Sequence, residues 1–392
     1  MLDKKEDELK VVVSVILPCL NEEASVGICI EKCFQIFSEQ GIAGEVVVVD
    51  NGSSDRSKEI ILKSQARLIE ESRRGYGSAY LKGFAAAKGD FLIMADADDT
   101  YDFFEISKFL EKLKEGNDFV IGNRLNGDIA QGKGAMPWLH RYIGSPFLTW
   151  LLNFLFKIEV KDAHCGMRAF TREAYQKLFL QTTGMEFASE MIINAGKAQL
   201  KIAELPINYR LRMGESKLRT FKDGWRHLRF MLLYSPTFLF LFPGAVLFFL
   251  GTIIIAPLTI GPVVIFGFFF DYNYMFLGSM MMLIGYQIIN LAFFTKMYAY
   301  SEKFEDEKND KIVKFLSKYI KLETMILIGL IIFLIGFSLL GYVYYLWMRR
   351  NNLGVATFFE VRKMIIAVTL MVLGLQTIFF GFFYSILRIK KV

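Results

Sequence analysis

Apolar residues are distributed differently in two parts of the chain, and the change falls near residue 236. Before it, apolar runs are short and charged residues separate them. After it the runs are long, and a run of about 20 residues is enough for a helix to cross the ~30 Å hydrocarbon core of a bilayer. The pattern predicts four membrane-spanning helices, at about 237–257, 273–296, 323–347 and 364–386.

The part before residue 236 alternates between strand and helix patterns. The run VVVSVILP (11–18) is rich in β-branched residues, which is typical of a strand buried on both faces. An amphipathic helix pattern follows, with Asn21 as its expected cap. GEVVVVD (44–50) and GDFLIMADAD (89–98) repeat the strand pattern. The alternation predicts a parallel sheet with helices on both faces, and such sheets bind ligands at the carboxyl ends of their strands.

The segment that joins the two parts, 217–235, has the pattern of a basic amphipathic helix. Its apolar and basic residues recur at spacings of three and four on different faces. A basic amphipathic helix that carries Trp favours a membrane interface with anionic headgroups; the alternative is a helix that packs on the core of its own domain. We therefore divide the chain into a first domain at 1–216, an interfacial helix at 217–235 and a membrane domain at 236–392.

Composition and charge agree with an integral membrane protein. The 392 residues are 53% hydrophobic, with a mean hydropathy of +0.34 and a net charge of +6. The first ten residues are charged and hold no apolar core, so we expect no signal peptide. Lys and Arg gather in 297–321 and in the C-terminal tail and are absent from 258–272, which predicts that the first domain and both termini are cytoplasmic. Loop 348–363, with four basic residues, is the exception.

Candidate chemistry begins with the carboxylates that close the strand at 89–98. Asp96, Asp98 and Asp99 cannot be core residues, because an unpaired buried charge is costly. Two carboxylates at i and i+2 on an extended strand end can bind a divalent cation together with a diphosphate. Oxygen ligands of this kind suit Mg²⁺ or Mn²⁺. A solvated acidic turn is the alternative interpretation.

Six motifs stand in order along residues 11–235: VSVILPCLNEE, VVVDNGSSD, RRGYGSAYLKGF, DADDTYD, VIGNR and DAHCGMRAF. This order resembles family-2 glycosyltransferases of the GT-A fold, and within them the polyprenyl-phosphate hexosyltransferases, such as dolichyl-phosphate mannose and glucose synthases. The resemblance implies an α/β GT-A catalytic domain, Rossmann-like with a mostly parallel sheet. An α-helical transmembrane domain of four helices would follow it.

The resemblance also implies a donor side of the site. Asp50 would recognise the base or ribose, unless it only closes an Asx turn. Asp96 and Asp98 would hold the metal, and Thr100 stands where mannose synthases often have Gln. Glycines beside the nucleotide would let backbone N–H groups approach it. The residues expected to bind the nucleotide sugar are Pro18, Asn21, Glu22, Asp50, Arg74, Gly75, Gly77, Asp96, Arg210 and Lys217.

The acceptor side follows from the later motifs. Arg141 and Ser145 are four residues apart and would share one helical face, where an Arg fork matches phosphate oxygens. Asp162 would position groups rather than take a proton, because a phosphate acceptor is already anionic. Glu190 would organise the site or be an ordinary helix acid. The residues expected to act in catalysis are Asp98, Arg124, Arg141, Ser145, Asp162 and Glu190.

These expectations combine into one function. The chain would transfer a hexose, from a donor of the UDP-glucose or GDP-mannose type, to a dolichyl or undecaprenyl phosphate at the cytoplasmic membrane face. The reaction would be inverting and would depend on Mg²⁺ or Mn²⁺. Analogy with the family allows a homo-oligomer, although the sequence does not fix the oligomeric state, and we expect no nucleic-acid partner. The alternatives are a non-catalytic membrane scaffold or flippase with a degenerate transferase domain, and a transferase that acts on another membrane lipid.

Overall fold

A seven-stranded sheet organises the first of two compact units, Met1–Met231 and Leu232–Val392. The computed structural model describes residues 11–130, 136–213, 220–301, 321–349 and 357–388. The strand order is β3-β2-β1-β4-β6-β5-β7. β6 is antiparallel to β4 and β5, and the other pairings are parallel. The strands are β1 Val13–Cys19, β2 Gly44–Asp50, β3 Arg67–Glu70, β4 Phe91–Met94, β5 Phe119–Asn123, β6 Arg168–Thr171 and β7 Ile202–Pro206.

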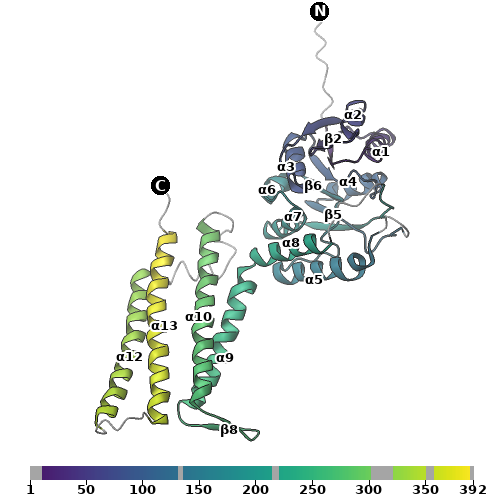
Figure 1. The fold of residues 1–392 in the computed structure, drawn as a ribbon. Helices are drawn as coiled ribbons and strands as arrows, with labels where there is room; N and C mark the ends of the chain where they lie inside the picture. The colour runs from purple at the N-terminus through teal and green to yellow at the C-terminus, as the bar shows by residue number, and fades with distance from the viewer. Residues whose placement is uncertain (1–10, 131–135, 214–219, 302–320, 350–356, 389–392) are drawn as a thin grey trace, which may run out of the picture. The chain divides into compact units, whose positions relative to one another are not determined.

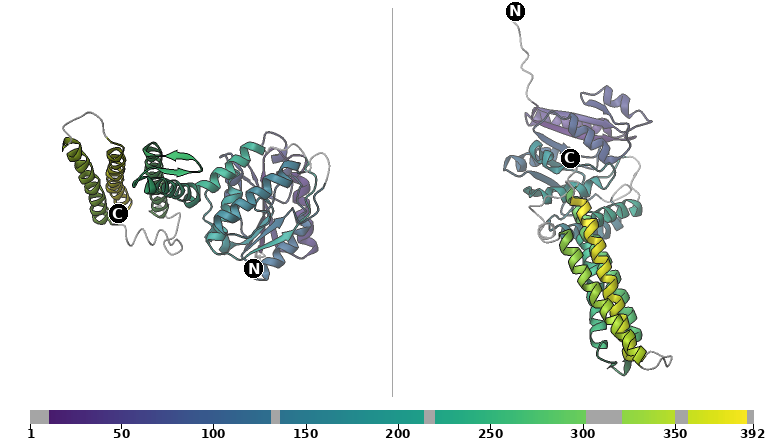
Figure 2. Two further views of the ribbon diagram at one scale, coloured as in Figure 1. Left: turned by 90° about the horizontal axis from the view of Figure 1, so that it is seen from below. Right: turned by 90° about the vertical axis from the view of Figure 1, so that its left-hand side faces the viewer.

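Helices cover both faces of this sheet, with α3, α6 and α7 on one face and α1 and α4 on the other (Figure 1 and Figure 2). The mostly parallel α/β fold that the sequence predicts is therefore confirmed. The helices are α1 Val26–Glu39, α2 Ser57–Leu62, α3 Tyr76–Ala86, α4 Ile106–Lys114, α5 Ser145–Phe156, α6 Arg172–Leu178, α7 Phe187–Lys197 and α8 Thr220–Leu233, with short helices η1 Phe103–Glu105 and η2 His140–Gly144.

The expected cap of the first helix is wrong. α1 begins at Val26 after Ser25, and no acidic residue lies in its first turn. Asn21 instead has a φ of 53°, a left-handed conformation that ends the strand rather than starting a helix. The amphipathic pattern itself is present in α1, whose buried face includes the thiols of Cys29 and Cys33.

The second unit contains four helices, among the described residues, that are long and apolar enough to cross a membrane: Thr237–Leu258, Tyr272–Tyr298, Leu322–Arg349 and Phe358–Leu387. This confirms the predicted transmembrane domain of four helices. The corresponding elements are η3 Thr237–Leu241 with α9 Phe242–Leu258, α10 Tyr272–Ser301, α12 Leu322–Arg349 and α13 Phe358–Arg388. A charge-free hairpin, β8 Val263–Ile265 and β9 Phe268–Phe270, joins α9 to α10.

Glycines allow these helices to pack closely in pairs. A Cβ atom added to Gly251 of α9 would stand 2.4 Å from the carbonyl oxygen of Gly278 in α10. Between α12 and α13, a Cβ atom on Gly329 would stand 2.7 Å from the Gly374 carbonyl oxygen. Small residues at such contacts let backbones approach in the absence of a hydrophobic driving force. Hydroxyl pairs then join α10 to α13, because Ser279–Thr369 and Tyr286–Thr377 are both 2.6 Å apart.

The basic loop 348–363 opposes the predicted membrane topology, but an acidic residue offsets the charge of one of its basic residues, Arg362. Arg362, at the start of α13, donates from Nε to Asp271 Oδ1 at 3.0 Å, and both side chains are largely buried. The positive charge of Arg362 is thereby offset within its own end of the helix bundle. The orientation of the helices in the membrane stays a prediction, and most of the Lys-rich segment 297–321 lies outside the described residues.

Replacing Gly251 with Ala should loosen the α9–α10 pair, because the added methyl group meets the Gly278 backbone. We expect a loss of about 1–3 kcal/mol in stability, measured as a lower melting temperature of the full chain in detergent. Gly341→Ala is the matched control, because no atom lies within 4 Å of a Cβ atom added there. Equal melting temperatures for the two variants would contradict the proposed packing.

Candidate functional site

The carboxyl ends of β1, β2 and β4 meet at one edge of the sheet, because β1 is the parallel neighbour of both other strands. Pro18 lies near the end of β1 and Glu22 in the loop after it. Asp50 ends β2, and Asp96 and Asp98 follow β4. The fold therefore places the predicted donor residues from three strand ends at one edge.

The Asp96 carboxylate lies between two tyrosine hydroxyls and a glycine. Its Oδ1 accepts from Tyr76 at 3.1 Å and from Tyr80 at 3.4 Å. A Cβ atom on Gly166 would stand 2.8 Å from Asp96 Oδ2, so glycine leaves the room that this carboxylate needs. Burial and the charge of Asp98 raise the pKa of Asp96 to about 7. Burial and the neighbouring charge of Asp98 thus both oppose ionisation of Asp96.

Asp98 uses its two oxygens differently. Oδ1 accepts from the Thr100 amide at 3.1 Å and from the Thr100 hydroxyl at 2.6 Å. Oδ2 pairs with Arg212 Nη1 at 3.0 Å, while Arg212 Nη2 donates to Glu22 Oε1 at 3.0 Å. Thr100, which stands where mannose synthases often have Gln, therefore orients the Asp98 carboxylate.

The donor atoms of Asp96 and Asp98 fit a divalent metal. They are carboxylate oxygens, which Mg²⁺ and Mn²⁺ prefer. Across the described ranges, no group of three His, Cys, Asp or Glu side chains could hold a metal ion. A metal held by these two residues would therefore complete its shell with phosphate and water. The position of Arg212 shows that the Asp98 carboxylate accepts a cationic partner at 3.0 Å.

Asn21 and Asp50 shape the turns after β1 and β2. The Asn21 Oδ1 accepts from the Ser54 amide at 2.7 Å. Asp50 is 1% exposed, and its Oδ2 accepts from the amides of Gly52 at 3.0 Å and Ser53 at 3.2 Å. These contacts are those of the Asx turn that the sequence left as the alternative. Recognition of a base or ribose by Asp50 stays a prediction.

The glycines of the RRGYGS motif have a packing role in the structure, and their expected role beside a nucleotide stays a prediction. A Cβ atom on Gly75 would stand 2.1 Å from the Thr183 carbonyl oxygen, and one on Gly77 would stand 2.3 Å from that of Thr182. The Gly75 N–H already donates to Asn51 Oδ1 at 2.7 Å. The absence of side chains at Gly75 and Gly77 thus lets the backbone of residues 182–183 pack against them, and the Gly75 amide is bound to Asn51.

Glu190 holds the loop that packs on these glycines. Its Oε1 accepts from the Gln181 amide at 3.0 Å, and its Oε2 accepts from the Thr182 amide at 2.9 Å and the Thr182 hydroxyl at 2.6 Å. These contacts make Glu190 a positioning residue for the loop. Arg74 is exposed, and its Nη2 lies 3.4 Å from the Gly52 carbonyl oxygen, beside the turn after β2.

Arg124 and Asp162 form a buried, two-point ion pair. Arg124 donates from Nε to Asp162 Oδ2 at 2.7 Å and from Nη2 to Oδ1 at 2.8 Å. Burial alone would raise the pKa of Asp162, but the Arg124 guanidinium holds it below its ordinary value. The charge of Arg124 also counteracts the rise in the pKa of Asp96. The predicted donor and acceptor sides therefore lie within electrostatic reach of each other.

The remaining predicted residues have other partners or lie outside the described residues. Arg141 is in η2, a π-helical turn, with its guanidinium 5.3 Å from the ring centre of Tyr142. Ser145 is the first residue of α5, so the regular helical face that the two were expected to share is interrupted. Arg210 pairs with Asp102 at 2.6 Å. Lys217 lies outside the described residues.

A pair of histidines, the half-buried His164 and the buried His227, could not be predicted from local sequence patterns. The rings of His164 and His227 are 4.7 Å apart, and Ser189 Oγ lies 2.8 Å from His227 Nδ1 and 3.4 Å from His164 Nε2. Burial lowers the pKa of both rings, that of His227 to about 4. Because the residues are far apart in the chain, their spacing could not reveal the cluster. The pair connects the DAHCGMRAF loop to helix α8.

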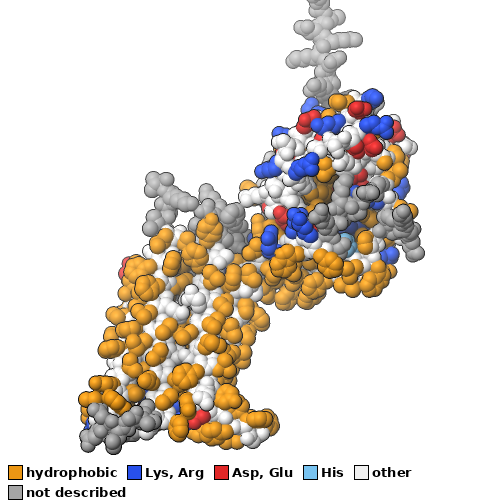
Figure 3. Space-filling view, in the orientation of Figure 1, with side chains coloured by type: hydrophobic (Ala, Val, Ile, Leu, Met, Phe, Trp, Pro, Cys, Tyr) orange, Lys and Arg blue, Asp and Glu red, His pale blue; other side chains and the backbone are white. Residues whose placement is uncertain are grey.

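Exposed aromatic side chains along η2 and α5 were also missed, although their spacing of three to five residues was readable. They include Trp138, Tyr142, Phe147, Trp150 and Phe154. Figure 3 shows hydrophobic side chains gathered along this edge of the first unit.

Helix α8 combines both interpretations left open by the sequence. Phe221 and Trp225 are exposed, as an interfacial helix requires, whereas His227 and Phe230 are buried, as in a helix that packs on its own domain.

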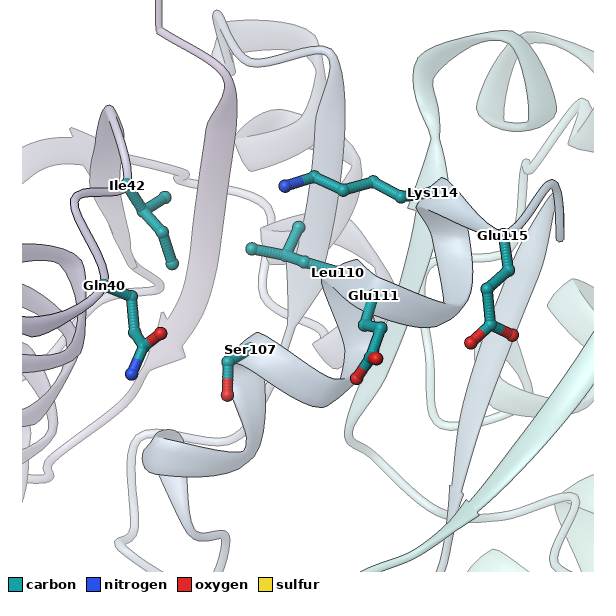
Figure 4. A pocket seen from close by; sticks show the side chains of 7 residues that line it. All are labelled: Gln40, Ile42, Ser107, Leu110, Glu111, Lys114 and Glu115. Atoms are coloured by element: carbon teal, nitrogen blue, oxygen red, sulfur yellow. The ribbon is translucent and has the colours of Figure 1, made fainter.

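A groove of about 410 Å³ lies at a different place in the first unit, between the end of α1 and the outer face of α4. Its lining residues are Gln40, Ile42, Ser107, Leu110, Glu111, Lys114 and Glu115 (Figure 4). Gln40 and Ile42 precede β2, so the groove lies toward the amino ends of the strands and does not belong to the candidate site.

Comparison with protein families gives two matches. Residues 14–179 match the model for glycosyl transferase family 2. Residues 293–388 match the model for the glycosyltransferase family 2 C-terminal transmembrane region.

Three relatives bear on function. The low-salt glycan biosynthesis hexosyltransferase Agl6 of Haloferax volcanii is 37% identical over 385 residues, covering 97% of this chain and 90% of the relative. A dolichyl-phosphate hexose transferase of the same organism is 36% identical, covering 54% of this chain and 89% of the relative. The dolichyl-phosphate beta-glucosyltransferase of Saccharomyces cerevisiae is 28% identical, covering 53% of this chain and 70% of the relative.

Acid should destabilise the first unit through the histidine pair. A His whose pKa falls from about 6.5 in the unfolded chain to about 4 in the fold resists protonation there. Its favourable contribution is therefore present above about pH 6.5 and is lost as the pH falls toward 4. We expect the melting temperature of the full chain to fall across this window and His227→Gln to flatten that fall. Identical pH profiles for the two proteins would contradict this assignment.

Proposed function

The chain belongs to glycosyltransferase family 2, and from this we propose that it transfers a hexose from a nucleotide sugar to a polyprenyl phosphate. The observation that carries the proposal is the arrangement at the sheet edge. There the acidic pair Asp96 and Asp98 adjoins, across Gly166, the loop whose Asp162 binds Arg124. Two relatives named for dolichyl-phosphate sugar transfer support a lipid phosphate as the acceptor.

In the proposed reaction, an oxygen of the lipid phosphate attacks the anomeric carbon of the donor sugar. The new carbon–oxygen bond forms as the bond from that carbon to the diphosphate breaks, and the nucleoside diphosphate leaves with the electron pair. Displacement in a single step inverts the anomeric configuration. A Mg²⁺ or Mn²⁺ ion held by Asp96 and Asp98 would offset the negative charge of the leaving diphosphate.

The contacts of Asp162 support an acceptor that needs no general base. A phosphate is ionised near neutral pH, whereas a sugar hydroxyl would require a group to take its proton. Asp162 is 0% exposed, is bound at both oxygens by Arg124, and has a lowered pKa. It is therefore a poor base, and its role is to orient the Arg124 guanidinium.

A lipid acceptor also requires that the site lie at the membrane surface. The exposed aromatics of η2 and α5, with Phe221 and Trp225 of α8, are the side chains that favour an interface. We place this surface against the cytoplasmic leaflet, in keeping with the distribution of Lys and Arg along the chain. On this proposal, the aromatic surface brings the sheet edge to a substrate that cannot leave the bilayer.

The test is transfer of labelled sugar by the full chain in detergent, with polyprenyl phosphate, Mn²⁺ and separate UDP-hexose and GDP-mannose donors. We expect one donor to give an organic-soluble product that EDTA abolishes. Asp98→Asn should lower the rate by about 100-fold or more in protein that still unfolds in one cooperative thermal transition. Glu111→Gln, in the groove near the opposite edge, should retain activity. Product formation that survives both EDTA and Asp98→Asn would refute the metal assignment.

Trp150 offers a separate test of the membrane surface. In vesicles, Trp150→Gln should raise the KM for polyprenyl phosphate by roughly three- to tenfold and leave the KM for the donor unchanged. Phe179→Gln is the control, because Phe179 is an aromatic that is even more exposed, 77% against 58% for Trp150, and lies at the end of α6. A rise in donor KM alone, or the same effect from both variants, would argue against docking through α5.

A further inference from the structure

Residues 207–213, which we term the strap, lie along the acidic loop that carries Asp98. The Met213 amide donates to the Asp98 carbonyl oxygen at 3.2 Å, and the Arg210 amide donates to that of Thr100 at 2.7 Å. The Tyr209 amide donates to the Asp128 carbonyl oxygen at 2.8 Å. Backbone hydrogen bonds thus set the register of the strap and determine which side chain faces the carboxylates.

The side chain in that position is Arg212. Its Nη1 lies 3.0 Å from Asp98 Oδ2 and its Nη2 lies 3.0 Å from Glu22 Oε1. All three side chains are largely buried, with exposures of 17% for Arg212, 5% for Asp98 and 10% for Glu22. The guanidinium therefore balances carboxylates from two separate strand ends.

This ion pair differs in kind from the one between Arg124 and Asp162. Arg124 gives two parallel hydrogen bonds to one carboxylate, which is the strong arrangement. Arg212 divides its fork between two acids, and its buried Nε has no hydrogen-bond partner among the described residues. Arg212 is thus held by charge more than by geometry, and another cation can replace it.

The atom that Arg212 occupies is the one that a metal would take. Asp98 Oδ1 is already engaged by the amide and hydroxyl of Thr100, which leaves Oδ2 as the remaining ligand atom. A divalent ion and a guanidinium on the same oxygen would repel each other at close range in a largely buried site. Binding of one therefore requires withdrawal of the other.

We propose that Arg212 is a resident counter-ion that occupies the metal position in the metal-free protein and competes with the divalent cation for Asp98. The proposal rests on the assignment of Asp98 as a metal ligand in the proposed function. Arg212 offsets part of the negative charge of the acidic edge before the substrate arrives and makes binding of metal alone weak. A metal that enters with an anionic diphosphate brings a new partner for the displaced guanidinium, so the two bind together more readily than the metal alone.

The experiment is titration of the full chain in detergent with Mn²⁺ alone, with free Mn²⁺ followed by electron paramagnetic resonance. We expect Arg212→Gln to bind Mn²⁺ about tenfold more tightly than the wild type, a typical coupling between two bound charges. Arg210→Gln removes the same charge from the same strap but pairs with Asp102, so it should bind Mn²⁺ as the wild type does. Equal tightening by both variants, or no change in Arg212→Gln, would overturn the competition.

Asp98→Asn separates this proposal from the one on which it rests. If Asp98→Asn binds Mn²⁺ normally, the metal assignment itself fails. If it loses Mn²⁺ while Arg212→Gln is unchanged, the metal site stands and the counter-ion role is refuted.

Thermal melts guard against a folding defect. Arg212→Gln should melt lower than the wild type in EDTA and gain more from Mn²⁺, because the metal replaces the missing charge. The melting temperature of Arg212→Lys, which keeps the charge on a single nitrogen, should fall between those of the wild type and Arg212→Gln. If Mn²⁺ raises the melting temperature of Arg212→Gln no more than that of the wild type, the result counts against the proposal.

Discussion

Concentrated negative charge at the carboxyl edge of the sheet is the constraint to which the rest of the first unit responds. Parallel strands bring the ends of β1, β2 and β4 together, and the loop that follows each of these strands carries acidic residues. Each carboxylate near the centre has a positive or polar partner: Lys32 for Asp99, tyrosine hydroxyls for Asp96, and Arg212, which Asp98 shares with Glu22. Leaving such charges unpaired in a largely buried site would cost more free energy than a domain of this size can spare.

The parts of this arrangement that the sequence predicts are those encoded locally. A run of β-branched residues identifies β1 and β2, and the strand ends then identify Glu22, Asp50 and the Asp96–Asp98 pair without further information. The residues that it does not predict act across long chain separations. The contact of the 182–183 backbone with Gly75, and the meeting of His164 with His227, depend on how β6, α7 and α8 return to the first strands. No local pattern carries that geometry.

In the membrane unit, too, local patterns predict some features, and contacts between distant residues determine the others. Apolar length alone predicts the four helices, because the bilayer sets a minimum span. It does not predict which helices pair, since lipid and protein interior are equally apolar. The pairing follows from glycines seven residues apart on α9, Gly244 and Gly251, and from hydroxyls that meet between α10 and α13. The role of Arg362 likewise cannot be predicted from its position in the sequence, because it depends on the ion pair with Asp271.

The contact between Gly166 and Asp96 has a consequence for attempts to redesign this enzyme. Gly166 of the DAHCGMRAF motif packs directly against Asp96 of the DADDTYD motif, and there is no space for a methyl group at position 166. On the proposed function, a library that varied the loop of Gly166 to change lipid preference would also disturb Asp96 if it included position 166. A substitution of His164 would not affect Asp96 in this way. It would instead affect α8, because His164 contacts Ser189, which contacts His227 of α8. On the proposed function, the packing at Gly166 therefore links the preference for the acceptor to the preference for the donor, because a side chain at this position would move Asp96.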